Sequence, residues 1–342
     1  MKRLLALVLC GLLLTGCAAP AAQNQAPIYE ATFLELFDTV TVVKGPAESR
    51  EAFDETARFV HDELERYHQL FDIYNSYEGR NNLKTVNDMA GISPVEVDES
   101  IISLLLDCRS YYELTAGRVD VTMGSVLRLW HDARNHGLND PAAARLPDME
   151  NLQAAAQHRG FDYVVIDETA STVYITDSDM ALDVGAVAKG WAAQKVAEQM
   201  PANMLLSVGG NVCATGPKTP AGDPWVIGVQ NPDHTGAQYL HTLYVTGGSY
   251  VTSGDYQRAY MVDGEVYHHI IDPETLMPSR YWRSVTIVCD DSGLADALST
   301  ALFVLPQDQG QALLDQCGAM AMWVDAGGNI YYSPGFKEII RT

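Results

Sequence analysis

Segments with strand-type and helix-type periodicity are interleaved along this chain without a regular strand–helix–strand order. Runs rich in Val, Thr and aromatic residues predict strands at residues 32–44, 161–167, 172–176, 204–208, 225–230, 242–246, 266–271, 284–289 and 319–324. Apolar residues every three to four positions predict helices at residues 51–74, 100–114, 188–200, 294–305 and 309–316. Because strict βαβ alternation is absent, an α+β fold is favoured over a doubly wound parallel sheet.

The chain begins with the features of a bacterial lipoprotein signal. Two basic residues follow Met1, a short apolar run ends at Leu14, and Leu14-Thr15-Gly16-Cys17 resembles a lipobox. The run is shorter than the roughly 20 residues that span a bilayer. We expect residues 1–17 to be a signal peptide with Cys17 as the lipidated residue; the alternative is an ordinary secretory signal with a chance cysteine.

The sequence after the signal predicts a tether, a folded domain and a membrane anchor. Residues 18–30 are expected to form a flexible tether, since their first part is rich in Ala, Gln and Pro, and residues 31–342 a folded domain. Lipidation of Cys17 would anchor the protein through its lipid to the outer face of the bacterial cytoplasmic membrane. No later stretch is long and apolar enough to span a bilayer.

Charge and cysteine usage exclude several classes of function. The formal net charge is −22, which argues against nonspecific nucleic-acid binding, and a polyanionic ligand would need a local cation or a basic pocket. No CxxC and no cysteine–histidine metal pattern occurs, so no zinc site is indicated. Buried free thiols are favoured over two disulfides at the four cysteines after the signal, which are Cys108, Cys213, Cys289 and Cys317.

A glycine-bearing turn runs into a helix at residues 183–191, with the sequence DVGAVAKGW. Glycines let a backbone approach a phosphate closely, and a helix N-terminus presents unpaired N–H groups. Lys189 could add a point charge. The pattern matches neither of the familiar nucleotide fingerprints GxGxxG and GxxxxGK[ST]. A tight strand-to-helix turn without a ligand has the same pattern.

Two further polar turns follow strand-type runs. Gly209 and Gly210 end the strand at residues 204–208 and could admit a ligand close to the backbone. Residues 252–256, TSGDY, gather two hydroxyls, an acid and a phenol. Each of these segments also fits an ordinary turn.

Two segments carry acid–base and metal chemistry. His268 and His269 precede Asp272-Pro273, and in a strand only one of two adjacent histidines can face a site. Asp296 and Thr300 are four residues apart, so a helix would place both oxygens on one face, where a hard cation could bind them. The alternatives are a structural histidine and a helix-capping aspartate.

In this order along the chain, these motifs resemble those of the ApbE family, the FAD:protein FMN transferases. Further matching pieces are Tyr74 with Asn75, Asn87, residues 115–124 and Trp130, so the resemblance spans almost all of the chain after the tether. The chain departs from the family at Leu276, where glycine commonly follows the threonine of a DPxTG motif. This departure concerns the geometry of one turn, because Asp272, Pro273 and Thr275 are present.

The resemblance implies a two-layer α+β architecture of mixed helices and sheets, an ApbE-like single catalytic domain that binds FAD in a cleft with Mg²⁺. By matched position, Asp296, Thr300 and the carbonyl of Ala186 would bind the metal, and His269 would be the proton acceptor. The FAD-binding residues implied in the same way are Tyr74, Lys189, Gly209, Gly210, Ser253, Asp255 and Tyr256.

The reaction implied by the resemblance is Mg²⁺-dependent transfer of FMN from FAD to a threonine hydroxyl of an acceptor flavoprotein, with release of AMP. Two alternatives stay open: Mg²⁺-dependent FAD pyrophosphatase activity giving FMN and AMP, and FAD binding without catalysis. The presence of His269, Asp296 and Thr300 favours an enzyme, because storage of FAD needs no proton acceptor. The expected partners are FAD, the acceptor flavoprotein and a membrane, and no nucleic acid.

Overall fold

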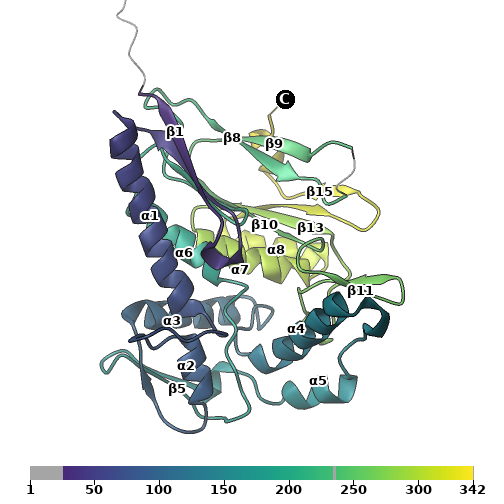
Figure 1. Cartoon of the computed structure of the whole chain (residues 1–342). Helices are drawn as coiled ribbons and strands as arrows, with labels where there is room; N and C mark the ends of the chain where they lie inside the picture. Colours follow the sequence, from purple (N-terminus) through teal and green to yellow (C-terminus); the bar gives the residue numbers. More distant parts are fainter. Residues whose placement is uncertain (1–25, 234–235, 342) are drawn as a thin grey trace, which may run out of the picture.

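A computed structural model describes residues 26–233 and 236–341 of the chain. Its centre is an eight-stranded antiparallel sheet in the order β1-β2-β6-β7-β10-β13-β14-β15 (Figure 1). The strands are β1 (Ile28–Phe33), β2 (Thr41–Pro46), β6 (Leu205–Val208), β7 (Asn211–Ala214), β10 (Gly248–Gly254), β13 (Ser284–Cys289), β14 (Met320–Val324) and β15 (Ile330–Tyr332).

Helices cover one face of this sheet. They are α1 (Arg50–Phe71), α6 (Ala188–Ala197), α7 (Ser292–Phe303) and α8 (Gln307–Cys317) (Figure 1). Since side chains alternate across a strand, Val43, Val251 and Ile287 point toward the helices, and all three are completely buried in the main core. The predicted α+β fold, with a sheet and a helical layer, is confirmed.

A two-stranded ribbon packs on the other face of the sheet. Its strands are β8 (Trp225–Gln230) and β9 (Tyr239–Val245). Trp225 and Leu243 of the ribbon share a second apolar cluster with Tyr250 and Val288 of the sheet. The sheet is therefore buried by helices on one side and in part by a ribbon on the other.

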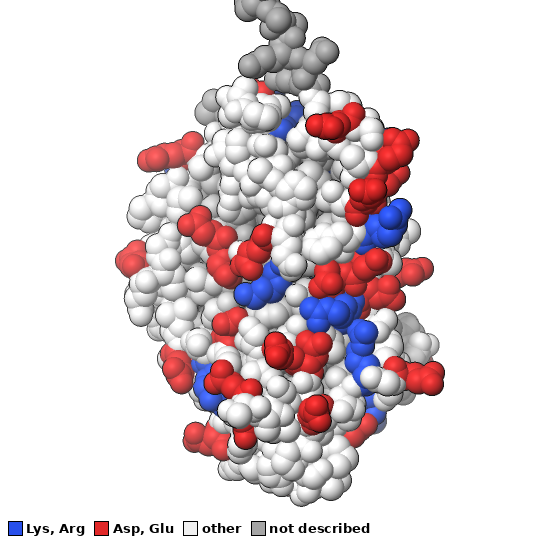
Figure 2. Space-filling view, turned by 90° about the vertical axis from the view of Figure 1, so that its left-hand side faces the viewer, with Lys and Arg blue, Asp and Glu red and all other residues white. Residues whose placement is uncertain are grey.

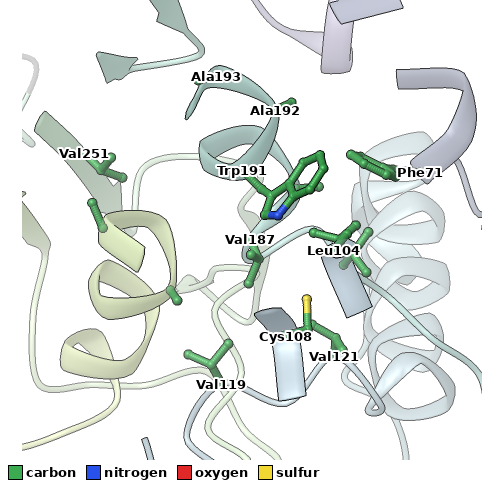
Figure 3. Packing of buried hydrophobic residues seen from close by; sticks show 14 of the residues in the cluster. Phe71, Leu104, Cys108, Val119, Val121, Val187, Trp191, Ala192, Ala193 and Val251 are labelled. Carbon is green, nitrogen blue, oxygen red and sulfur yellow. The ribbon is translucent and has the colours of Figure 1, made fainter. Parts of the chain in front are cut away.

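The remaining elements form a smaller part below the sheet (Figure 1). They are the helices α2 (Leu83–Asp88), α3 (Glu99–Leu114), α4 (Gly124–Asn139) and α5 (Met149–Ala155), and the strands β3 (Val95–Glu96), β4 (Val164–Asp167), β5 (Thr172–Ile175), β11 (Tyr260–Val262) and β12 (Glu265–Tyr267). Trp191 of α6 ties the two parts together. Its ring meets Phe71 edge-on at 5.5 Å (Figure 3). Its Nε1 donates to the Asp107 carboxylate at 2.8 Å.

The structure corrects three boundaries drawn from the sequence. Residues 28–30, assigned to the tether, lie in β1 and pair with β2. The single strand expected at residues 32–44 is broken, because Phe37 and Asp38 both have a φ of 53° and form a 3-10 turn between β1 and β2. The strand expected at residues 266–271 ends at Tyr267. The helices α2, α4 and α5 were not predicted.

The signal peptide, Cys17 and residues 18–25 of the tether lie outside the described residues, so their assignments stay predictions. None of the helices in the described ranges is both long and apolar enough to cross a membrane. All four cysteines of the folded part are free thiols, as expected, but only Cys108 and Cys213 are buried, while Cys289 and Cys317 are partly exposed. Burial raises the pKa of Cys213 to about 11. Acidic side chains are spread over the face seen in Figure 2, in keeping with the charge of the sequence.

Candidate active site

A cavity of about 580 Å³ lies where the sheet, the start of α6 and the smaller part of the molecule meet. It is lined from β10, α6, α7, α4 and the loop after β12. This cavity brings together most of the residues that the sequence singled out, which are Tyr74, Ala186, Lys189, Gly209, Ser253, His269, Asp296 and Thr300.

At the corner of the cavity near Asp296, a backbone hydrogen bond of a regular helix is replaced by a bond to a side chain. The N–H of Gly190 donates to Oδ2 of Asp296 at 2.8 Å. In a regular helix it would donate to the carbonyl of Ala186, four residues earlier, and no such bond is present in the described backbone. The Ala186 carbonyl therefore keeps its lone pairs at the edge of the cavity.

Gly190 allows α6 and α7 to touch at this point. A Cβ at position 190 would lie 2.2 Å from the carbonyl oxygen of Ser292 and 2.5 Å from the Cβ of Asp296. No side chain can be accommodated at such distances without moving backbone. The close contact between α6 and α7 therefore explains why position 190 is a glycine, whether or not a phosphate also lies close to it.

The oxygens at this corner fit a hard divalent cation. Asp296 is 4% exposed, and its Oδ2 lies 3.5 Å from Nζ of Lys189. Within the described residues, no hydrogen bond uses its Oδ1 or the hydroxyl of Thr300, one turn further along α7. A carboxylate, a hydroxyl and a backbone carbonyl with free lone pairs are ligands that Mg²⁺ accepts.

Hydrogen bonds of Ser299 and Ser253 fix the position of α7 at this corner of the cavity. Oγ of Ser299 donates to the carbonyl of Asp296 at 2.8 Å, and it lies 2.7 Å from Oγ of Ser253 on β10. The bonds connect α7 to the sheet directly behind the proposed ligand. Ser253, predicted as an FAD residue, therefore lines the cavity and also positions α7.

His269 presents one nitrogen to the cavity. Its Nδ1 lies 3.1 Å from the carbonyl of Gln257, and because a carbonyl only accepts, Nδ1 carries the proton and Nε2 is the acceptor. Desolvation by the surrounding walls, then the charges of Arg258 and Lys189, lower its pKa from 6.5 to about 3. The ring opens onto the cavity, and it is neutral at pH 7.

The neighbouring His268 has both nitrogens occupied. Its Nε2 donates to the Ser279 carbonyl at 2.7 Å, and its Nδ1 accepts from the N–H of Ile270 at 3.2 Å. The imidazole therefore has no free site for a proton from a ligand. Of the two histidines in the sequence HHIIDP, only His269 can act as a base in this geometry.

Tyr74 lies at the opposite end of the cavity and stacks on His131. The two ring centres are 5.1 Å apart with an angle of 27° between the planes. Burial, then the charge of Asp183, raises the pKa of Tyr74 to about 12, so the phenol is neutral. Asp72, just after α1, fixes the backbone by accepting from the N–H of Tyr74 at 2.6 Å. The stacked pair forms a flat apolar wall with a polar edge.

Three of the predicted FAD residues are placed differently. Gly210 and Tyr256 line a second cavity next to the first, and Gly209 lines both. Asp255 lines neither cavity, since its carboxylate lies 3.2 Å from Nε of Arg283 and its N–H donates to the Arg283 carbonyl. The structure does not bring Asp255 to the cavity, because the charge of Arg283 holds it on the far side of β10.

Sequence reasoning missed the basic residues of the cavity. Arg118, Arg134 and Arg258 all line it, from three separate segments. Arg118 lies 3.5 Å from the Asp272 carboxylate, whereas the described residues offer no ion-pair partner to Arg134 or Arg258. Nε of Arg134 is buried without a hydrogen bond, and burial together with Arg258 lowers the pKa of Arg134. The same cavity is also lined by the carboxylates of Asp38, Asp120, Asp183 and Asp296, so it carries both signs of charge, and the guanidiniums with Lys189 are the groups in it that could hold a polyanion.

Leu276 adopts the backbone conformation for which glycine is suited. Its φ is 59°, in the left-handed region, which costs a non-glycine residue about 1–2 kcal/mol. The turn closes nevertheless, since the Leu276 N–H donates to the Asp272 carbonyl at 2.8 Å and Nε1 of Trp130 donates to the Leu276 carbonyl at 3.0 Å. Its side chain is buried in a local cluster, which offsets the strain.

A cavity that gathers free oxygens, cationic side chains and a neutral histidine, on an α+β fold, has the composition of an enzyme active site. The chain belongs to the ApbE family, whose model matches residues 37–331. A relative from Treponema pallidum, named FAD:protein FMN transferase, is 33% identical over 280 residues, which cover 76% of this chain and 75% of the relative. A relative of the same name from Escherichia coli K12 is 24% identical over 347 residues, covering 98% and 96%.

Solved structures give the same result for the fold. The ApbE protein of Thermotoga maritima matches with a TM-score of 0.80 and 32% identity over 92% of this chain and all of that one. The flavinyl transferase ApbE of Pseudomonas stutzeri, solved in its apo form, matches with a TM-score of 0.75 and 24% identity over 92% of this chain and 97% of that one.

Proposed function

We propose that this protein transfers FMN from FAD to a threonine hydroxyl of an acceptor flavoprotein, in a reaction that depends on Mg²⁺. Membership of the ApbE family and the name shared by its relatives support the transfer of FMN. The observation that supports the metal is the Gly190–Asp296 hydrogen bond, because it leaves the Ala186 carbonyl free beside an aspartate and a threonine. Bound there, Mg²⁺ would neutralise negative charge on the phosphate oxygens.

The remaining groups of the cavity have clear chemical roles. Lys189, Arg134 and Arg258 would hold the diphosphate of FAD by charge, and Tyr74 with His131 would offer a flat surface to a ring. The hydroxyl proton of the acceptor passes to Nε2 of His269. The oxygen–phosphorus bond to FMN forms, the bond to the bridging oxygen breaks, and AMP leaves with that oxygen.

The low pKa of His269 in the free protein bears on this step. A neutral imidazole can accept a proton, but a base whose pKa is far below 7 accepts it weakly. The lowering charges come partly from Arg258 and Lys189, and the diphosphate of bound FAD would offset both. Substrate binding would therefore remove the part of the lowering of the His269 pKa that comes from Arg258 and Lys189, while the largest contribution, from desolvation, would stay.

We also propose that Cys17 carries a lipid and that the enzyme acts outside the cytoplasm. The lipobox sequence ending at Cys17 supports this, and β1 begins at Ile28, shortly after it. A connection of 10 residues spans at most about 35 Å when extended, so the domain would stay close to the membrane surface. Acceptors would then be proteins exposed on the same side.

Intact-mass analysis of the acceptor tests the proposed function. Residues 18–342 are incubated with FAD, Mg²⁺ and a threonine-bearing flavin-acceptor domain, with a threonine-to-alanine acceptor as the control. An FMN adduct on the first acceptor alone, abolished by a chelator, is the expected result. Free FMN and AMP without an adduct would instead identify an FAD pyrophosphatase, and unchanged FAD would leave only binding.

A further inference from the structure

A second cavity of about 430 Å³ adjoins the first and has no role in the reaction as derived so far. It lies between the exposed face of the main sheet and the β8–β9 ribbon. Val42 and Val212 line it from the sheet, and Ile227 and Leu243 line it from the ribbon. A Cβ at Gly210, on its margin, would meet no atom within 4 Å, which shows open space above this turn.

The two cavities meet beside the proposed base. Thr39, Gly209, Thr252 and Gln257 line both of them. Gln257 is the residue whose carbonyl accepts from Nδ1 of His269 and so aims Nε2. A group that enters from the second cavity therefore reaches the first next to His269.

The charges of the two cavities differ. Lys189, three arginines and four aspartates line the first, whereas no charged side chain lines the second among the described residues. Valine, isoleucine and leucine side chains alternate there with the hydroxyls and amides of Tyr239, Gln230 and Gln238. An anionic diphosphate belongs in the first cavity. The second suits an uncharged segment of polypeptide, which has both apolar atoms and backbone groups to pair.

The reaction needs two directions of access to one phosphorus. In an in-line displacement the attacking and the leaving oxygen lie on opposite sides of that atom. If the charged cavity holds FAD, including the AMP that leaves, the attacking hydroxyl must come from another side. The second cavity is the opening that leads to His269 from such a side.

We infer that the second cavity receives the segment of the acceptor polypeptide that carries the target threonine. This inference rests on the proposed function. Its substrate class is an uncharged segment of polypeptide, since the lining offers no partner for a charge. Gly210 leaves open space on the margin of the second cavity, and the hydroxyl arrives beside Nε2 of His269 while FAD occupies the first cavity.

A pair of substitutions on β8 tests the inference. Ile227 lines the second cavity, whereas the next residue back, Val226, is 48% exposed and lines neither cavity, because neighbours on a strand face opposite sides. Ile227→Trp fills the cavity, and Val226→Trp adds the same ring on the outside. Val212→Phe, on the sheet side, is a second and milder obstruction.

Two quantities are measured for each variant: the KM for an acceptor domain that wild-type enzyme modifies, and the Kd for FAD by flavin fluorescence. We expect Ile227→Trp and Val212→Phe to raise the KM by about tenfold or more and to leave the Kd within about twofold, with Val226→Trp like wild type. An unchanged KM in both folded obstructing variants overturns the inference. The inference is also overturned if the Kd for FAD rises as much as the KM for the acceptor, because FAD would then occupy this cavity. Absence of any adduct with wild-type enzyme overturns the proposed function instead.

Discussion

Replacing Gly190 by alanine is expected to separate α6 from α7 and to weaken the Mg²⁺ site. The new Cβ would lie 2.2 Å from the Ser292 carbonyl oxygen, while ordinary contact begins at 3.4 Å, so the helices must move apart by about 1 Å. The hydrogen bond from Gly190 to Asp296, now 2.8 Å long, would then exceed hydrogen-bonding distance.

The effect of Gly190→Ala on the free energy of unfolding has opposing contributions. Loss of a hydrogen bond to a charged group costs about 1.5–3 kcal/mol, and overpacking at the helix contact costs about 1–3 kcal/mol. Alanine returns about 1 kcal/mol through its higher helix propensity. We therefore expect the free energy of unfolding to fall by about 3 kcal/mol, as measured by urea denaturation without Mg²⁺. Because Asp296 lies on α7 and Ala186 in the turn that leads into α6, calorimetry should show Mg²⁺ affinity reduced by about 10- to 100-fold.

Gly247→Ala is the matched control for this substitution. A Cβ at Gly247 would meet only the Ala214 carbonyl oxygen, at 3.9 Å, so both the stability and the Mg²⁺ affinity should stay close to wild type. If Gly190→Ala also kept wild-type stability and Mg²⁺ affinity, the close contact between α6 and α7 would not be what holds the site, and the reasoning would be refuted.

Three other substitutions test separate parts of the proposal. Asp296→Asn keeps the shape but removes the charge, so calorimetry should show Mg²⁺ affinity reduced at least about tenfold; wild-type affinity would remove Asp296 from the site. His269→Gln should slow FMN transfer at least about a hundredfold while FAD affinity stays the same, and a joint fall of both would make His269 a binding residue. The pKa of His269 is lowered in the folded protein, so below pH 6.5 the unfolded state binds a proton that the folded state does not. Wild type should therefore lose stability relative to His269→Gln as the pH falls from 6.5. The loss should be less than about 1.4 kcal/mol per pH unit, because the ring opens onto the cavity. Cys17→Ser should release the protein from membranes in fractionation, and continued membrane association would contradict the lipobox assignment.

The part of the site that the sequence predicted is the part encoded within short segments. A spacing of four residues placed Asp296 and Thr300 on one helical face because α7 is regular there. The resemblance supplied the third oxygen, on Ala186. What neither could give is the reason that this carbonyl is free, since Gly190 and Asp296 are 106 residues apart and meet only through packing.

The basic residues of the cavity could not be predicted for the same reason. Arg118, Arg134 and Arg258 stand singly in the sequence, in segments that contact one another only after α4 and the loop after β10 have packed. The broken strand at Phe37 and Asp38 is a different case. Phe37 is a residue that strands favour whereas Asp38 is not, and the positive φ values of both belong to the turn that leads the chain from β1 into β2.

The charge of the protein explains why binding of FAD would call for both the arginines and the proposed metal. With a formal net charge of −22, and with acidic side chains spread over its surface, the molecule repels FAD and other polyanions at long range (Figure 2). Salt screens these exposed charges over about 10 Å, while the groups inside the cavity are screened far less. Arg134 and Arg258 lack carboxylate partners within the described chain, so their charge is available to a ligand. The acidic carboxylate of Asp296 would add to the repulsion unless a cation bound it, and the same cation can then hold the phosphate.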